Sequence, residues 1–263
     1  MSMSKKTYAA IILAAITIIF VGCRIISAIW LNAVMPKERK DTFVKDDSLD
    51  PKVRSALEKL DGDYAKIRWG CEYSIFEDFP GIVVSIAPYY TDPYHYLAVA
   101  VTNVTPEEVV FSGDMQAKAA DDEVIGTGFF FKEHIGSGCT IMLPMFCGTD
   151  KAPDGRIHWS NVELEAAKEE VSLPWTSEWN ISKDPSFKRA QAKVLIGETG
   201  FITPDIKMVS AFLVDGEGII LSGATEYFHE KPVFGRYQAD LDFYIDGPSQ
   251  ERISDMAVFA GFR

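Results

Sequence analysis

The stretch MVSAFLVDGEGIILSG, residues Met208–Gly223, predicts a β-hairpin and with it a fold rich in β-strands. Two apolar runs flank Asp215-Gly216, a dipeptide that favours chain reversal because both residue types tolerate positive φ. An earlier stretch, MQAKAADDEVIGTG at Met115–Gly128, has the same outline, with Asp121-Asp122 at its turn. The chain therefore contains one hairpin pattern twice.

A constant offset of 94 residues relates the two copies, because it aligns Asp121 with Asp215 and Glu123 with Glu217. The same offset aligns further positions: Ser160-Asn161 with Ser254-Asp255, Val162 with Met256, and Leu164 with Val258. A repeat of roughly 95 residues lies within the usual size range of a domain. We therefore expect two tandem copies of one domain in this chain of 263 residues.

Short apolar strands between turn signals fill both copies. Strands are expected at Ile82–Ile86, Tyr96–Thr102 and Thr140–Cys147, and Pro88–Pro93 is expected to be a loop. The clearest alternation in the second copy places these side chains on one face: Ala239, Leu241, Phe243 and Ile245, against Asp240, Asp242 and Tyr244. Because no helix-length period separates the strands, the fold class is all-β, with sandwich domains at 67–166 and 186–263 and a linker at 167–185.

The N-terminal residues 1–35 are expected to be a membrane anchor or a lipoprotein signal. Tyr8–Val34 is almost entirely apolar or small, and Tyr8 and Trp30 stand about 33 Å apart in a helix, which matches the two aromatic belts of a transmembrane segment. Phe20–Cys23 resembles a lipobox, the bacterial signal in which the cysteine, here Cys23, is acylated. A cleaved secretory signal is the third alternative, although Arg24 and the continuing apolar run leave no usual cleavage site. All three alternatives place the rest of the chain outside the cytoplasm.

Residues 36–66 are expected to form a linker with one short helix. Asp50 caps this helix, Pro51 occupies its first turn, and Val53, Leu57 and Leu60 recur at helical spacing. The helix is too short to be stable alone, so it should pack on the first domain.

The charge is unevenly placed along the chain. Residues 1–47 carry seven Lys/Arg and four Asp/Glu, which leaves −15 for the remainder of a chain whose formal charge is −12. An acidic body repels phosphate and therefore argues against binding of nucleic acid or anionic lipid.

No catalytic or cofactor motif occurs in the sequence. The four histidines, at positions 95, 134, 158 and 229, lack metal-ligand spacing, and no nucleophile elbow, phosphate loop or zinc-protease motif is present. Asp121 and Asp215 offer the hard oxygen ligands that calcium prefers, but turn chemistry already accounts for them. We therefore predict no enzyme activity, no catalytic or metal-ligating residues and no cofactor.

Cysteine spacing gives no redox or zinc motif, since no CxxC occurs. Cys139 and Cys147 would stand about 26 Å apart on a straight strand, too far for a disulfide. Buried thiols are therefore expected, and a bridge from Cys71 to one of the two is the alternative.

Two groups of aromatic residues are the candidates for a binding surface. One is the tyrosine group around the expected loop, namely Tyr89, Tyr90, Tyr94 and Tyr96. The other is the pair Trp175 and Trp179 in the expected linker. Large amphipathic rings of this kind bind proteins and glycans when exposed, and otherwise pack in cores or domain interfaces.

The repeat resembles the FxLYD-type immunoglobulin-like domain of bacterial envelope proteins. The resemblance is carried by VTNVT at Val101–Thr105, the hairpin Met115–Gly128, GSGCT at Gly136–Thr140, and AFLVD at Ala211–Asp215, which is similar to the naming motif. The sequence departs from the pattern at Ser137, where the family prefers Pro. The resemblance implies immunoglobulin-like sandwiches displayed outside the membrane, and it implies no activity.

We therefore expect a non-catalytic binding or spacer module of the bacterial cell envelope, anchored in the cell membrane by one N-terminal segment. Its partner would be an envelope protein or a glycan and not nucleic acid. The alternatives are a structural or accessory subunit of an envelope assembly, which would use a sheet edge, and an enzyme of unrecognised type, which would need a pocket with convergent polar groups.

Overall fold

A computed structural model describes residues 41–45, 49–60, 62–70, 72–76, 79–148, 150–168, 175–198, 205–230 and 236–262. Residues Arg39–Arg263 form one compact unit. The predicted anchor, residues 1–35 with Cys23, lies outside the described residues. Within the described part of the chain, no helix has the length and apolar character needed to span a membrane.

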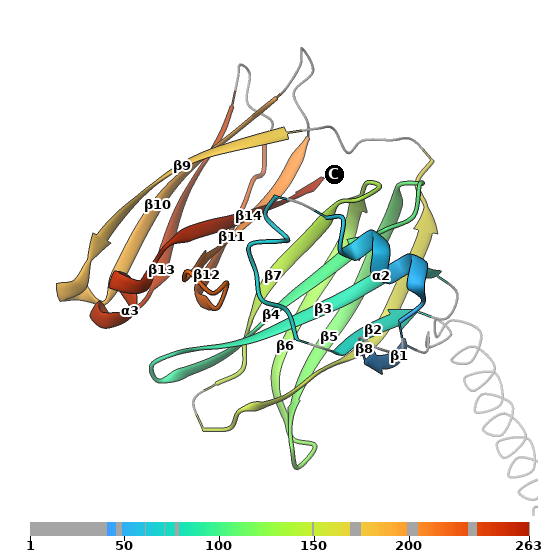
Figure 1. Ribbon diagram of the computed structural model, residues 1–263, viewed down its shortest axis with the longest axis horizontal. Coiled ribbons are helices and arrows are strands. Elements are labelled where there is room, and N and C mark those ends of the chain that lie inside the picture. Colours follow the sequence, from blue (N-terminus) through green and yellow to red (C-terminus); the bar gives the residue numbers. More distant parts are fainter. Residues whose placement is uncertain are drawn as a thin grey trace, which may run out of the picture. The chain divides into compact units, whose positions relative to one another are not determined.

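Strands dominate the described chain, with two short α-helices and one 3-10 turn (Figure 1). In chain order the elements are β1 Asp41–Lys45, α2 Pro51–Leu57, β2 Glu72–Phe76, β3 Phe79–Thr91, β4 Tyr94–Asn103, β5 Val109–Ala119, β6 Val124–Ile135, β7 Thr140–Phe146, β8 Pro153–Ala166, β9 Trp175–Asp184, η2 Pro185–Phe187, β10 Arg189–Glu198, β11 Ile206–Val214, β12 Ile220–Tyr227, β13 Tyr237–Tyr244, α3 Gly247–Arg252 and β14 Asp255–Phe262. The prediction of an all-β fold is confirmed.

The two halves of the chain have the same order of strand pairing. In the first half, β3 to β8, the strands pair in the orders β3-β4-β7 and β6-β5-β8. In the second half, β9 to β14, they pair in the orders β9-β10-β13 and β12-β11-β14. One residue pair, Phe262 with His134, joins β14 to β6 and makes the two hairpin groups one six-stranded sheet.

The two hairpin tips have the same turn, but at an offset of 96 residues. In the first tip the Ala119 amide donates to the Glu123 carbonyl, and in the second the Asp215 amide donates to the Ile219 carbonyl. The residue with positive φ is Asp122 in one tip and Gly218 in the other. The offset of 94 therefore aligned the acidic residues two positions away from their structural equivalents. Because strand side chains alternate with a period of two, this slip kept core positions aligned with core positions.

Each half encloses its own apolar core. In the first half β3, β4 and β7 contribute Ile82, Leu97 and Ile141, which meet Phe111 and Trp159 from the opposite strands. The core of the second half contains the predicted alternating residues of β13, Ala239, Leu241, Phe243 and Ile245, all buried. The exposed side chains of the same strand are Asp240, Asp242 and Tyr244, so this predicted alternation is confirmed.

A third apolar core lies between the two halves. Ala87, Ala98 and Ala100 present small side chains on the outer faces of β3 and β4, where they meet Phe212 and Phe259 of the second half. Gly223 is part of this contact, because a Cβ there would stand 2.6 Å from the Phe212 ring. The halves therefore pack against each other through an apolar interface.

The segment before β2 contacts both halves. The helix α2 begins as predicted: the Asp50 side chain accepts from the Lys52 amide at 2.8 Å, and Val53 and Leu57 are buried against Val83 of β3. It ends at Leu57, short of the expected Leu60. Residues 62–70 then continue into the core between the halves. The segment before β2 therefore packs against the first half through α2 and against both halves through residues 62–70.

Candidate functional site

The β3–β4 hairpin positions the four candidate tyrosines. The expected loop Pro88–Pro93 is instead the end of β3 and the turn into β4, since Tyr89 pairs with Tyr96 and Tyr90 with His95. Neighbouring residues in a strand point to opposite faces. Tyr89 and Tyr96 therefore share one face of the hairpin, and Tyr90 lies on the other.

Tyr89 is a packing residue. It is 6% exposed, stacks on Tyr96 with ring centroids 5.0 Å apart, and meets the Phe212 ring edge-to-face in the core between the halves. Its hydroxyl is buried without a hydrogen-bond partner among the described residues. Burial raises the pKa of Tyr89 well above its ordinary value, so this hydroxyl keeps its proton.

Tyr94 and Tyr96 belong, with Tyr89, to an aromatic cluster that spans both halves. The Tyr96 ring contacts Phe146 of β7, and Tyr94 contacts both Phe146 and Tyr244 of β13, with ring centroids 5.5 to 5.9 Å apart. All three pairs are tilted or edge-to-face. Phe146 is 51% exposed and Tyr244 is 41% exposed, so the cluster opens to solvent. The name aromatic cluster is used below for Tyr89, Tyr94, Tyr96, Phe146 and Tyr244.

A cleft of about 500 Å³ adjoins the aromatic cluster. Its walls include Tyr89, Tyr90 and Tyr96 from the hairpin, and Ile219–Leu221 from the start of β12. Asp246 and Arg252, at the two ends of α3, complete it. Asp246 already accepts from the Ser249 amide and Arg252 already donates to Asp215, so rings and apolar side chains provide the available surface.

The two candidate tryptophans lie elsewhere, on a strand. The segment predicted as a linker contains β9, which carries both Trp175 and Trp179 at the edge of the β13-β10-β9 sheet. Trp175 packs partly against the core of the second half, and Trp179 is 38% exposed. The structure thus separates the tryptophans from the aromatic cluster.

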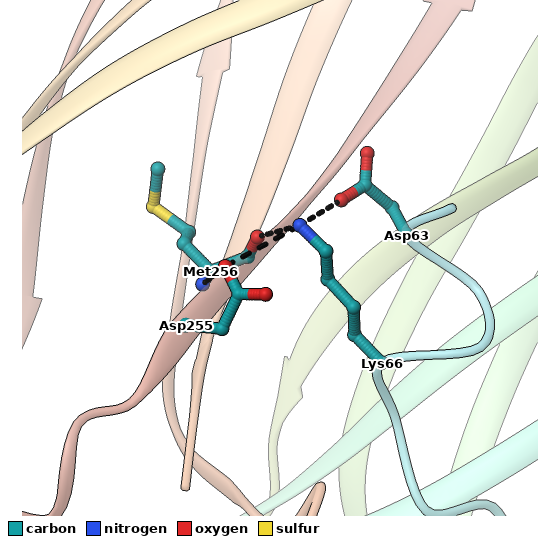
Figure 2. A network of polar contacts seen from close by, with 4 residues as sticks. All are labelled: Asp63, Lys66, Asp255 and Met256. Atoms are coloured by element: carbon teal, nitrogen blue, oxygen red, sulfur yellow. Dashed lines mark hydrogen bonds and ion pairs between the residues drawn. The ribbon is translucent and has the colours of Figure 1, made fainter. Parts of the chain in front are cut away.

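A polar network joins the 62–70 segment to β14, as Figure 2 shows. The Lys66 ammonium lies 2.9 Å from Asp63 and 3.3 Å from Asp255, and it donates to the Met256 carbonyl at 2.9 Å. Burial alone would lower the pKa of Lys66, but the two carboxylates outweigh it and raise the pKa. Burial in turn raises the pKa of Asp63. A catalytic lysine needs the opposite shift, so this network ties two parts of the fold together.

The hairpin-tip carboxylates that could suit calcium are bound to protein groups. Asp215 accepts from the Glu217 and Ile219 amides at 3.0 Å and from Arg252. Although burial opposes the shift, these bonds lower the pKa of Asp215. Asp121 and Glu123 both bind Lys151. Within the described ranges, His, Cys, Asp and Glu side chains nowhere gather in threes as a metal ion would require.

The histidines are dispersed and two of them meet carboxylates. His134 Nδ1 lies 2.7 Å from Glu108, and His158 Nε2 lies 3.6 Å from Asp154. Cys139 and Cys147 are free thiols, and Cys147 is buried as expected. Burial raises the pKa of Cys147 to about 11, which makes it a poor nucleophile. Cys71 lies outside the described residues.

Sequence reasoning missed Phe146 and Tyr244, which complete the aromatic cluster. The alternation of side chains along a strand could have indicated both residues, because each lies next to predicted core residues and therefore points away from the core. Large aromatic residues at outward positions of two separate strands are unusual enough to suggest a shared surface. Searches against protein-family models and against curated proteins find no match to this chain.

Proposed function

We propose that this protein is a non-catalytic binding module of the bacterial cell envelope, held in the cell membrane by its N-terminal segment and displayed outside the cytoplasm. The aromatic cluster and the adjoining cleft form its ligand-binding surface. One observation carries the proposal: rings from β4, β7 and β13 converge, Phe146 and Tyr244 stay about half-exposed, and Tyr96 connects these rings to the cleft. Exposed aromatic groups of this size typically mark interaction sites.

We also propose that the halves, β3 to β8 and β9 to β14, are two tandem immunoglobulin-like domains, so that the second begins with β9 at Trp175 and not at residue 186. If the six strands of a half are lettered A to F, one sheet pairs in the order A-B-E and the other pairs C with both D and F. An immunoglobulin sandwich likewise pairs A, B and E in one sheet and C with F in the other. The resemblance of the sequence to FxLYD-type domains is consistent with this topology.

Binding is favoured over catalysis because Asp246 and Arg252, the two charged side chains that line the cleft, are already bonded to other protein groups. Asp246 caps α3 and Arg252 binds Asp215, so neither offers a general acid or base. Tyr90 donates its hydroxyl to Asp92 at 3.1 Å. A reaction would require convergent polar groups aimed at one substrate atom.

The hydrogen bonds that these polar side chains already make within the protein also favour a polypeptide ligand over a glycan. Sugar recognition needs many free donors and acceptors around an aromatic platform, whereas Asp246, Arg252 and Tyr90 of this cleft are already bonded to protein groups. The exposed rings also meet at steep angles, such as 67° between Tyr96 and Phe146, so they form ridges and grooves and not one flat platform. Apolar or aromatic side chains of an envelope protein would fit between such rings.

A capture experiment tests the proposal. The full-length chain, tagged and solubilised in detergent, is incubated with envelope extract of the cells that produce it, alongside Tyr90→Ser and Phe146→Ser variants. The matched control is Phe187→Ser, which removes a ring that is 77% exposed in η2, outside the cleft. Tyr90 lines the cleft and Phe146 belongs to the aromatic cluster beside it, and we expect both variants to lose a captured protein that the control retains.

Two results would contradict the proposal. Equal capture by all four proteins would reject the aromatic cleft as the binding surface. Capture that survives protease treatment of the extract and disappears after glycan digestion would reject a polypeptide ligand.

A second candidate function, a structural subunit of an envelope assembly, draws support from a different place. The strand β9 is an edge strand with ten residues in one unbroken ladder. Such edges pair with strands of other chains.

A further inference from the structure

The shared pairing order of the two halves exposes one difference between them. The first strand of the first half, β3, is covered on its outer edge by β2, with Tyr73 opposite Ser85 and Ile75 opposite Val83. The corresponding strand of the second half is β9, which pairs with β10 on one side. In the part of the chain that the structure describes, its other edge has no strand beside it.

Three other edge strands among the described residues, β7, β8 and β13, are protected against strand pairing, and β9 is not. The edge strand β7 contains Pro144, and β8 carries a bulge at Asn161, whose φ is 51°. The edge of β13 is occupied by side chains of β12, because Glu226 accepts from the Asp240 amide and Ser222 donates to the Tyr244 carbonyl. Proline, bulges and such coverage are the usual means of preventing strand pairing.

The ladder between β9 and β10 runs from Trp175 to Asp184 without a register shift. The sequence WTSEWNISKD contains no proline, and none of its residues has positive φ. Strands with these properties present a regular row of backbone donors and acceptors on their free edge.

The free edge is also the open end of an apolar core. Trp175 and Ile181 are partly buried against the core of the second half, and Trp179, on the same face of β9, is 38% exposed. A strand placed beside β9 would cover these three side chains. In the first half the equivalent position is filled by β2, so the fold itself shows that an antiparallel strand fits there.

We propose that β9 pairs antiparallel with β9 of a second copy of this chain, forming a two-fold symmetric dimer with one continuous six-stranded sheet. In a two-fold symmetric dimer the same edge of each copy supplies the backbone hydrogen-bond partners of the other, so no second kind of edge is required. Along β9, the backbone N–H and C=O groups of every second residue point to the free edge. In an antiparallel pair such a residue lies opposite a residue whose groups also point to that edge, so two paired residues are both odd-numbered or both even-numbered.

The pairing centred on Asn180 is the most complementary of these registers. It places Trp179 opposite Ile181 of the second copy, twice, and an aromatic ring opposite a β-branched side chain is a favourable pair. A centre at Ile181 would oppose Glu178 with Asp184 twice, which costs stability because like charges repel. A centre at Trp179 would oppose the two Trp179 rings once on the axis and set Ser177 against Ile181 twice, so it makes one favourable aromatic pair where the centre at Asn180 makes two.

The charge of the chain adds a signature to the dimer. Each copy carries a formal charge of −12, so two copies repel each other. Dissolved salt screens this repulsion, with a Debye length of about 8 Å at physiological ionic strength. The dimer should therefore strengthen as salt is added, opposite to an association driven by opposite charges.

Disulfide trapping tests the dimer and its register on the full-length chain in detergent. Asn180→Cys places two thiols opposite each other across the axis, whereas Glu178→Cys, on the same exposed face two residues away, does not. We expect mild oxidation to convert most of Asn180→Cys, and little of Glu178→Cys or of the unaltered chain, into a covalent dimer. The unaltered chain should sediment as a dimer whose share rises with salt.

Three outcomes would overturn the proposal. The unaltered chain could sediment as a monomer at every concentration and salt level. The two cysteine variants could cross-link equally, which would reject the register and the pairing. Asn180→Cys could cross-link in cells to a different protein and not to itself, which would assign the edge to another partner. None of these outcomes involves the aromatic cleft, so the capture experiment stays independent.

Discussion

A buried ion pair beside the junction of the two halves gives the sharpest stability prediction. Glu133 of β6 has a side chain that is only 3% exposed, and its Oε1 lies 2.6 Å from the ammonium of Lys207 in β11. Its Oε2 has no hydrogen-bond partner among the described residues. Replacing the cation by Lys207→Met keeps most of the chain length of the side chain and leaves a buried carboxylate without its counter-charge.

The expected loss follows from this burial. Removing one partner of a buried ion pair costs about 3 to 5 kcal/mol, because the remaining charge is uncompensated. Lys207 is itself 22% exposed and water can reach part of the site, so we expect the lower end, about 3 kcal/mol.

The loss should depend on pH. Burial raises the pKa of Glu133 above its ordinary value in the folded protein, and Lys207 opposes the rise. Because the folded state then holds the proton more tightly than the unfolded state, stability falls as pH rises from the unfolded pKa through the folded pKa. Loss of Lys207 raises the folded pKa further. The deficit of Lys207→Met should therefore be largest at pH 7 and smaller at pH 5, where part of Glu133 is protonated.

Urea unfolding of the full-length chain at pH 7 and pH 5 measures the effect. The matched control is Lys193→Met, which removes a lysine 3.9 Å from Asp240 with both side chains more than half exposed. Exposed pairs contribute little, so the control should change stability by less than about 1 kcal/mol. A Glu133→Gln change added to Lys207→Met should restore part of the loss. The reasoning is refuted if Lys207→Met costs no more than the control, or if its deficit grows as the pH falls.

Three further predictions concern the hairpin tip, the interface and the anchor. Asp215→Ala leaves the Glu217 and Ile219 amides without their acceptor and should lower the free energy of unfolding by about 1 to 3 kcal/mol at pH 7. Because the pKa of Asp215 is lowered in the folded protein, the stabilisation by its carboxylate exists above the unfolded pKa and disappears as pH falls through the folded pKa. Urea unfolding should therefore show a smaller loss of stability for Asp215→Ala at pH 3 than at pH 7. Equal stability of the variant and the unaltered chain at pH 7 would contradict this prediction. Phe212→Ala empties a fully buried position between the halves and should cost about 3 to 5 kcal/mol in urea unfolding, and a loss below about 1 kcal/mol would show that the interface is not tightly packed. Mass spectrometry of the mature N-terminus should find residues before Cys23 intact, as the transmembrane alternative requires; diacylglycerol on Cys23 with residues 1–22 absent would establish the lipoprotein alternative.

Local sequence signals predicted the elements whose chemistry is local. Asp50-Pro51 predicted the start of α2, because a cap and a proline act within one turn. The alternation of Ala239 to Ile245 predicted the two faces of β13, because side-chain direction follows from strand period alone. The turn that begins at Asp215 was also predicted, but its residue with positive φ is Gly218 and not the Asp215-Gly216 pair on which the prediction rested.

The candidate site was only partly predictable, because it depends on contacts between distant strands. The Pro88–Pro93 segment contains turn-forming residues, and only its pairing with β4 makes most of it strand. Trp175 and Trp179 stand in a segment of mixed polarity, and pairing with β10 makes that segment β9. Tyr244 contacts Tyr94 through packing between the two halves, although the two residues are 150 positions apart in the chain.

Photocrosslinking from the aromatic cluster beside the cleft tests the proposed function most directly. A photoreactive benzoylphenylalanine replaces Phe146 in the full-length chain, and the control carries it in place of Phe187, which is more exposed but lies outside the cleft. Irradiation of producing cells should link the Phe146 variant, and not the Phe187 variant, to one envelope protein. No adduct from Phe146, or the same adducts from both positions, would contradict the assignment of the aromatic cleft as the binding surface.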